Sequence, residues 1–165
     1  MSLGEDSGST VDIGTMRGRD YPTISQFTIF LENRVGALQS FLRRFVNTQV
    51  RILALSTNDS TEYCILRCIL SHPEQGREIL ERAGLAMIET DLIAIELQPS
   101  PQPLLEVCNA LLRAEINLLQ TYALMAQSET GTVVALMVDN IDQAQDTLTS
   151  HGVRLLTENE LTDLI

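Results

Sequence analysis

The 165-residue sequence has 44% hydrophobic residues and a formal net charge of −11, from 22 acidic and 11 basic side chains. This length suits one ordinary domain or two small ones, and the apolar content is enough for a packed core. The negative charge argues against sequence-independent attraction to nucleic-acid phosphates or to anionic membrane surfaces.

No apolar segment reaches the about 18 residues needed to span a bilayer, and the N-terminus has no signal-peptide pattern. Cys64 and Cys68 are four residues apart in a predicted strand, so about 13 Å separates them, too far for a disulfide. His72 and His151 are far apart in sequence and have no metal-ligand spacing. We therefore expect a cytoplasmic protein that binds no metal and needs no cofactor.

The chain begins with a segment that we do not expect to fold. Residues 1–22 are rich in Gly, Ser and Asp and lack periodicity, which predicts a disordered tail.

Residues 24–32, ISQFTIFLE, alternate with the two-residue period of a strand. A helix follows, because an apolar stripe with helical spacing is formed by Leu38, Phe41, Leu42, Phe45 and Val46. The side chains predicted to face away from it are Gln39, Ser40, Arg43 and Arg44.

Asn33 and Gly36 lie between this strand and this helix. The Asn33 side chain can hold a turn and cap the helix. Gly36 permits either close backbone approach or a conformation that other residues resist.

The next segments predict two further strands, a helix and another strand. VRILALSTN and EYCILRCIL form a hairpin around Asp59 and Ser60. His72-Pro73 ends this strand, Pro73 suits the first turn of a helix, and the helix stops at Gly84. Residues 85–98 are divided at Glu89-Thr90-Asp91, so that LAMIE closes one unit and DLIAIELQ opens another.

The second half repeats this order. Leu31, Leu38 and Phe41 align with Leu97, Leu104 and Val107 at an offset of 66 residues, and Gly84 aligns with Gly152 at 68. We predict an α+β protein with two tandem ferredoxin-like βαββαβ modules, whose antiparallel sheets carry helices on one face. The first domain spans residues 23–90 and the second 91–165, ending in a short tail helix.

Strands of both halves are apolar on both sides, as in EYCILRCIL and TVVALMV. Helices cover one face of each sheet, so the other face must be buried against the sister module or a second chain. We predict a homodimer, or at least tight pairing of the two modules.

These features resemble the ACT domain, a small regulatory module that binds amino acids. The resemblance covers about residues 24–157 and rests on the βαββαβ order, on the loop from Asn33 and Gly36 to Ala37-Leu38, and on AEINLLQTYAL in the second copy. It is closest to stand-alone tandem ACT proteins. The second loop, PSPQPLL, departs from the pattern because Gln102 and Pro103 replace Gly36 and Ala37.

The resemblance implies that backbone N–H groups at the first loop receive a ligand carboxylate. Gly36 would allow its approach, Asn33 would hydrogen-bond the ligand, and Glu32 would balance the ammonium. The predicted ligand-binding residues are Glu32, Asn33, Arg34, Val35, Gly36, Ala37, Leu38 and Tyr122.

Four of these residues also have a purely structural interpretation. Asn33 can simply cap a helix and Gly36 can simply serve the turn. Arg34 is either a carboxylate partner or a solvated charge, and Tyr122 either reaches a ligand or packs. Cys64, Cys68 and Cys108 are predicted to be apolar packing groups.

The sequence favours a non-catalytic regulatory protein that binds a small amino acid. It has no evident nucleophile and base, and no phosphate-binding glycine loop, so an enzyme is not expected. The alternative is a ligand-independent regulatory subunit or dimerisation module of a partner metabolic enzyme.

Overall fold

The computed structural model describes residues 21–129 and 131–165, so the predicted tail lies almost wholly outside the described residues. The first half contains β1 (Ile24–Glu32), α1 (Ala37–Leu42), the 3-10 helix η2 (Arg43–Phe45), β2 (Ile52–Asp59), β3 (Tyr63–Leu70), α2 (Pro73–Arg82) and β4 (Met87–Glu96). The second half contains α3 (Pro103–Arg113), β5 (Leu118–Gln127), β6 (Thr132–Val138), α4 (Ile141–Ser150), β7 (Arg154–Leu156) and α5 (Glu158–Asp163).

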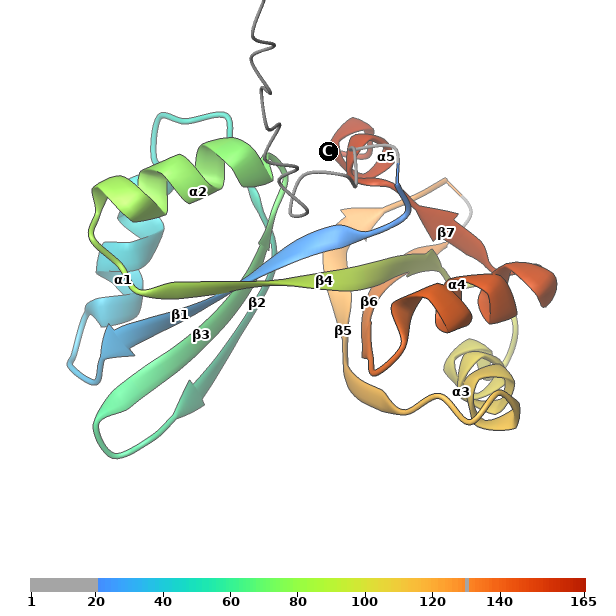
Figure 1. Cartoon of the computed structure of the whole chain (residues 1–165). Coiled ribbons are helices and arrows are strands. Elements are labelled where there is room, and N and C mark those ends of the chain that lie inside the picture. The colour runs from blue at the N-terminus through green and yellow to red at the C-terminus, as the bar shows by residue number, and fades with distance from the viewer. Residues whose placement is uncertain (1–20, 130) are drawn as a thin grey trace, which may run out of the picture.

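The strands form a continuous antiparallel arrangement in the order β2-β3-β1-β4-β6-β5, with β7 also paired to β4. We call β2, β3, β1 and the first part of β4 the first sheet, and the second part of β4 with β6, β5 and β7 the second sheet. Each half shows the strand arrangement of a ferredoxin-like module, and the predicted fold is confirmed. In Figure 1, α1 and α2 lie on the outer side of one half, and α3 and α4 lie on the outer side of the other.

One strand, β4, belongs to both modules (Figure 1). Its first part pairs with β1, from Met87 opposite Ile29 to Leu92 opposite Ile24. Its second part pairs with β6 from Ile93 and with β7 from Ala94. The predicted division into two strands at residues 89–91 is therefore wrong, although the two parts pair as expected. The shared strand has no break at residue 90. The domain limits 23–90 and 91–165 stay a prediction.

Three clusters of buried side chains make up the core. One lies between the first sheet and α1, η2 and α2, and a second lies between the other sheet and α3 and α4. The third cluster joins the two sheets, with Ile24 and Leu53 from one module packed in the same group as Leu124 and Val133 from the other. The sister module therefore covers the sheet face that the sequence leaves without helices.

The helix that follows β1 buries only part of its predicted apolar stripe. Phe41 and Phe45 enter the core, where their rings meet edge to face at a centroid distance of 5.3 Å. Leu38, Leu42 and Val46 remain 36%, 36% and 62% exposed. The same pattern is found on α3, where Val107 and Leu111 are buried. The three exposed residues above correspond, at the offset of 66, to residues that are also exposed: Leu104, Cys108 and Leu112.

The three cysteines are free thiols with different surroundings. Cys68 is buried, and this burial raises the pKa of its thiol to about 12. Cys64 is half-buried and packs against the core cluster between the first sheet and α1, η2 and α2. Cys108 is exposed, so its predicted packing role is wrong. No helix among the described residues is long and apolar enough to cross a membrane.

The tail helix α5 begins with a reciprocal capping box. The Thr157 hydroxyl accepts from Glu160 N at 3.2 Å, and the Glu160 carboxylate accepts from Thr157 N at 2.9 Å. Arg154 Nη2 donates to the same carboxylate at 3.1 Å. The backbone hydrogen bond from Thr157, followed by the contact with Arg154, lowers the pKa of Glu160.

We expect Glu160→Gln to flatten the acid side of the stability profile. A carboxyl whose pKa is lower in the folded state than in the unfolded state contributes stability at neutral pH, and that contribution is lost as the pH falls below about 4.5. Urea unfolding at pH 7, 5 and 4 should therefore show a smaller acid loss for the variant than for the wild type. Glu62→Gln, in the β2–β3 turn, is the matched control, and an equal flattening there would contradict the assignment.

Candidate functional site

The loop between β1 and α1 makes a tight bend at Gly36. Gly36 adopts the left-handed conformation, with φ 84° and ψ 0°, and it precedes the first residue of α1. A Cβ atom built on it would meet no atom within 4 Å. Of the two roles predicted for this glycine, the structure supports the special backbone conformation.

Asn33 fastens this loop to the neighbouring hairpin. Its side-chain amide donates to Asp59 Oδ1 at 2.8 Å and to the Ser60 carbonyl at 3.1 Å. The N-cap of α1 is Gly36, and no side chain of a described residue caps this helix, so the predicted capping role of Asn33 is wrong. The hydrogen bonds instead hold the β1–α1 loop against the turn between β2 and β3.

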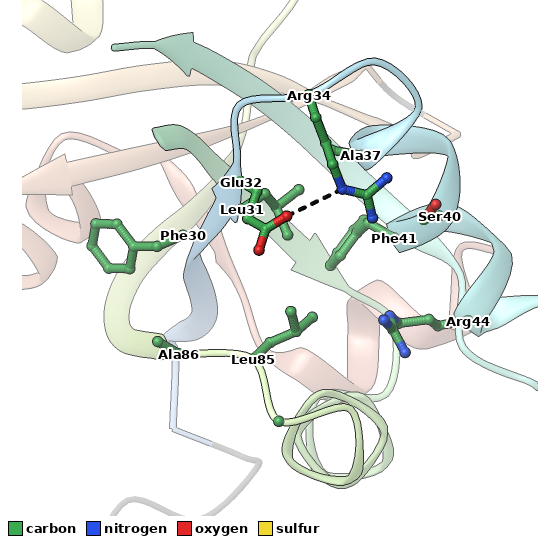
Figure 2. Close-up of a pocket in the computed structure, with 11 residues that line it drawn as sticks. Phe30, Leu31, Glu32, Arg34, Ala37, Ser40, Phe41, Arg44, Leu85 and Ala86 are labelled. Carbon is green, nitrogen blue, oxygen red and sulfur yellow. Dashed lines mark hydrogen bonds and ion pairs between the residues drawn. The ribbon is translucent and has the colours of Figure 1, made fainter. Parts of the chain in front are cut away.

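A cavity of about 380 Å³ adjoins this loop (Figure 2). It lies between the end of β1, the inner side of α1 and η2, and the loop from Gly84 to Ala86 that joins α2 to β4. Leu31, Phe41 and Leu85 supply apolar surface to it. This combination of an apolar wall with a few charged groups is typical of small-molecule sites.

Three charged side chains stand around the cavity. Arg34 Nε donates to Glu32 Oε2 at 3.2 Å, which forms an exposed ion pair at the mouth. Arg44 comes from η2, and Figure 2 shows its guanidinium group on the other side of the cavity. Arg44 makes no ion pair with any described residue. The site therefore carries one paired cation, one unpaired cation and one carboxylate.

Comparison with known proteins identifies the duplicated fold. The family model described as "ACT domain pair" matches residues 22–165. The chain belongs to the ACT domain pair family. The predicted resemblance is thereby confirmed over nearly all the described residues.

Solved structures share this fold. A protein from Bacteroides thetaiotaomicron shares 25% sequence identity with this ACT pair, covers 86% of this chain and 97% of its own, and superposes with a TM-score of 0.77. The regulatory subunit of aspartate kinase from Thermus thermophilus is 11% identical, with 78% of this chain and 91% of its own covered and a TM-score of 0.53, and it shows the fold alone. A search of curated proteins finds no match.

The structure brings together some of the predicted binding residues of the ACT pair. Glu32, Arg34 and Ala37 line the cavity. The predicted residues that do not line it are Asn33, Val35, Gly36, Leu38 and Tyr122. Among these, Val35 is fully exposed on the loop and Tyr122 lies between the two sheets, where its hydroxyl donates to Gln26 Oε1.

Sequence reasoning missed Ser40, Arg44 and Leu85. The helical period placed Ser40 and Arg44 on the side facing away from the apolar stripe, whereas both line the cavity. The α2–β4 loop fills the opposite side and brings in Leu85, which is far away in sequence. A comparison of the two repeats could have pointed to Arg44, because its counterpart 66 residues later is Ala110.

Proposed function

We propose that this protein is a non-catalytic regulatory protein that binds a small amino acid in the cavity of its first ACT module. The observation that carries the proposal is the Glu32–Arg34 ion pair at the mouth of an apolar-walled cavity. A carboxylate beside a guanidinium complements the ammonium and carboxylate of a zwitterion. The exposed ion pair can exchange partners at little cost, because surface pairs contribute only about 0–1 kcal/mol.

A six-residue helix such as α1 has too few aligned peptide units to bind an anion on its own. Two amides of the loop are also already used, since Arg34 N donates to the Glu32 carbonyl and Ala37 N donates to the Arg34 carbonyl. The proposal therefore assigns ligand recognition to the side chains of Glu32 and Arg34 rather than to the backbone alone.

Binding would act by shifting an equilibrium between two states of association. A ligand can do this only through different affinities for the two states. The partner we propose is a metabolic enzyme or a second copy of the chain, in the cytoplasm. The free thiols of this ACT pair are consistent with a reducing compartment.

We expect at least one of the twenty common L-amino acids to raise the melting temperature of the purified protein. Titration calorimetry should then show that Arg34→Gln weakens that ligand by about tenfold or more, because a hydrogen bond to a charged group contributes about 1.5–3 kcal/mol. Arg82→Gln is the control, since Arg82 pairs with Glu78 on the surface of α2 and does not line the cavity. A screen without any response, or equal affinities for Arg34→Gln and wild type, would refute the proposal.

A second candidate is a ligand-independent regulatory subunit or dimerisation module. It is favoured by exposed apolar side chains on the outer helices of both modules, among them Leu38 and Leu42 on α1 and Leu104 and Leu112 on α3. Apolar residues repeated on outer helices are typical of surfaces that contact another protein. Association with a partner enzyme that is equally strong with and without amino acids would favour this candidate.

A further inference from the structure

The first cavity has a counterpart in the second module. This second cavity, of about 230 Å³, lies between the end of β4, α3 and the loop after α4. Its lining residues Leu97, Pro103 and Val107 are 66 positions after Leu31, Ala37 and Phe41 of the first cavity. Gly152 likewise follows Gly84 by 68 positions. The duplicated fold thus provides an internal comparison in which the shape recurs and the charges can differ.

The charged residues of the two cavities do differ. Arg44 corresponds to Ala110, and Ser40 corresponds to Glu106. Neither Arg34 nor Arg44 has a basic counterpart among the residues that line the second cavity. Glu32 corresponds to Gln98, and Phe30 corresponds to Glu96. The second cavity therefore lacks the guanidinium groups that distinguish the first.

Among the described residues, ion pairing leaves one arginine unpaired at the first cavity and one glutamate unpaired at the second. In the first, Glu32 pairs with Arg34 and Arg44 remains. In the second, the carboxylate of Glu96 is 2% exposed and pairs with Arg154 at 3.0 Å, while Glu106 remains. A chain with a net charge of −11 repels anions overall, so a local unpaired cation decides where an anionic group can bind.

Building on the proposed function, we propose that the first cavity selects an amino acid whose side chain ends in an anionic group, and that Arg44 determines this specificity. Glu32 receives the ammonium, Arg34 the α-carboxylate, and Arg44 the side-chain anion, a carboxylate or a phosphate. Figure 2 shows the three charged ends around one space, with Phe41 and Leu85 beside it. A planar guanidinium suits both anions because it can donate two parallel hydrogen bonds.

The neutral isosteres of the acidic amino acids make the test selective. An unpaired guanidinium gains a charge-assisted hydrogen bond from a carboxylate, and it gains less from the carboxamide of the same shape. We expect L-aspartate or L-glutamate to bind at least tenfold more tightly than L-asparagine or L-glutamine in titration calorimetry. Addition of O-phospho-L-serine and L-serine distinguishes a phosphate from a carboxylate as the preferred anion.

The decisive variant is Arg44→Gln, with Arg43→Gln as its matched control. Arg43 is adjacent, exposed and equally charged, but it does not line the cavity. In Arg44→Gln, the affinity for the acidic ligands should fall by tenfold or more, and the affinity for the neutral ligands should not change. Arg43→Gln should bind both kinds of ligand like the wild type. Both arginines are exposed, so both variants are expected to fold, and circular dichroism checks this.

The outcomes separate this inference from the proposed function. Tighter binding of neutral than of acidic amino acids would overturn the specificity and leave amino-acid binding intact. Equal losses in Arg43→Gln and Arg44→Gln would also overturn it, because a general charge effect would then explain the preference. Failure of every amino acid to bind would overturn the proposed function itself, and the role of Arg44 with it.

Discussion

Leu92→Ala is expected to lower the free energy of unfolding by about 2–5 kcal/mol, the cost of removing a buried leucine side chain from a packed core. Leu92 is fully buried in the cluster that joins the two sheets. It is also the residue of β4 at which pairing with β1 ends. Because β4 runs on into the second module, the loss should weaken both modules together.

Two measurements check this expectation. Urea unfolding followed by far-ultraviolet circular dichroism should give one transition at a lower midpoint than the wild type. Hydrogen exchange followed by mass spectrometry should show lower protection in peptides from both β3 and β6. Loss of protection in β6 alone, with β3 unchanged, would mean that the modules unfold independently.

Ile88→Ala provides the matched control on the same strand. Ile88 lies four residues before Leu92, so both side chains point to the same face of β4, but Ile88 is 55% exposed. Truncation of an exposed side chain typically changes stability by about 0.5 kcal/mol. If Ile88→Ala costs as much as Leu92→Ala, burial between the sheets is not what stabilises this strand.

The order of the elements could be predicted because it depends on local signals. Pro73 begins α2, and Gly84 and Gly152 stand just beyond α2 and α4 in the left-handed conformation that glycine tolerates. A proline in the first turn and a left-handed glycine just after the last turn are local signals for where a helix begins and ends. The repeat then followed from finding these signals twice in the same order.

The continuity of β4 could not be predicted in the same way. Glu89, Thr90 and Asp91 are polar and suggest a turn, yet their backbone pairs with Phe27, Gln26 and Ser25 of β1. The carboxylate of Glu89 also receives two hydrogen bonds from Arg77, at 2.9 and 2.6 Å. Contacts with segments distant in sequence keep these residues in a strand, and a local pattern does not contain them.

The residues of the candidate site likewise fall into those that the sequence could predict and those that it could not. Glu32, at the end of β1, and Arg34, in the following loop, could be predicted because the ACT resemblance rests on the turn marked by Asn33 and Gly36 beside them. Arg44 and Leu85 could not, because their part in the cavity depends on how η2 and the α2–β4 loop approach β1. The helical pattern also predicted more buried side chains than the structure has, because the contact between the helix and the sheet decides which of them enter the core.

Tyr122→Phe is expected to destabilise the protein by about 1–3 kcal/mol, the usual cost of a buried polar group that loses its partner. The Tyr122 hydroxyl donates to Oε1 of Gln26, and Gln26 is almost fully buried. A tyrosine hydroxyl is already protonated at neutral pH, and burial raises the pKa of Tyr122 further, so it is a hydrogen-bond donor here. Chemical denaturation of the variant measures the loss.

The double variant Gln26→Leu/Tyr122→Phe tests the hydrogen bond, and the ligand affinity of Tyr122→Phe decides between the two roles predicted for this tyrosine. Replacing both partners by apolar groups removes the unsatisfied amide, so most of the stability should return. If Tyr122 only joins the sheets, Tyr122→Phe leaves the affinity for L-aspartate unchanged. A weaker affinity with unchanged stability would instead assign Tyr122 to the ligand, and the inter-sheet hydrogen bond would then contribute little to holding the modules together.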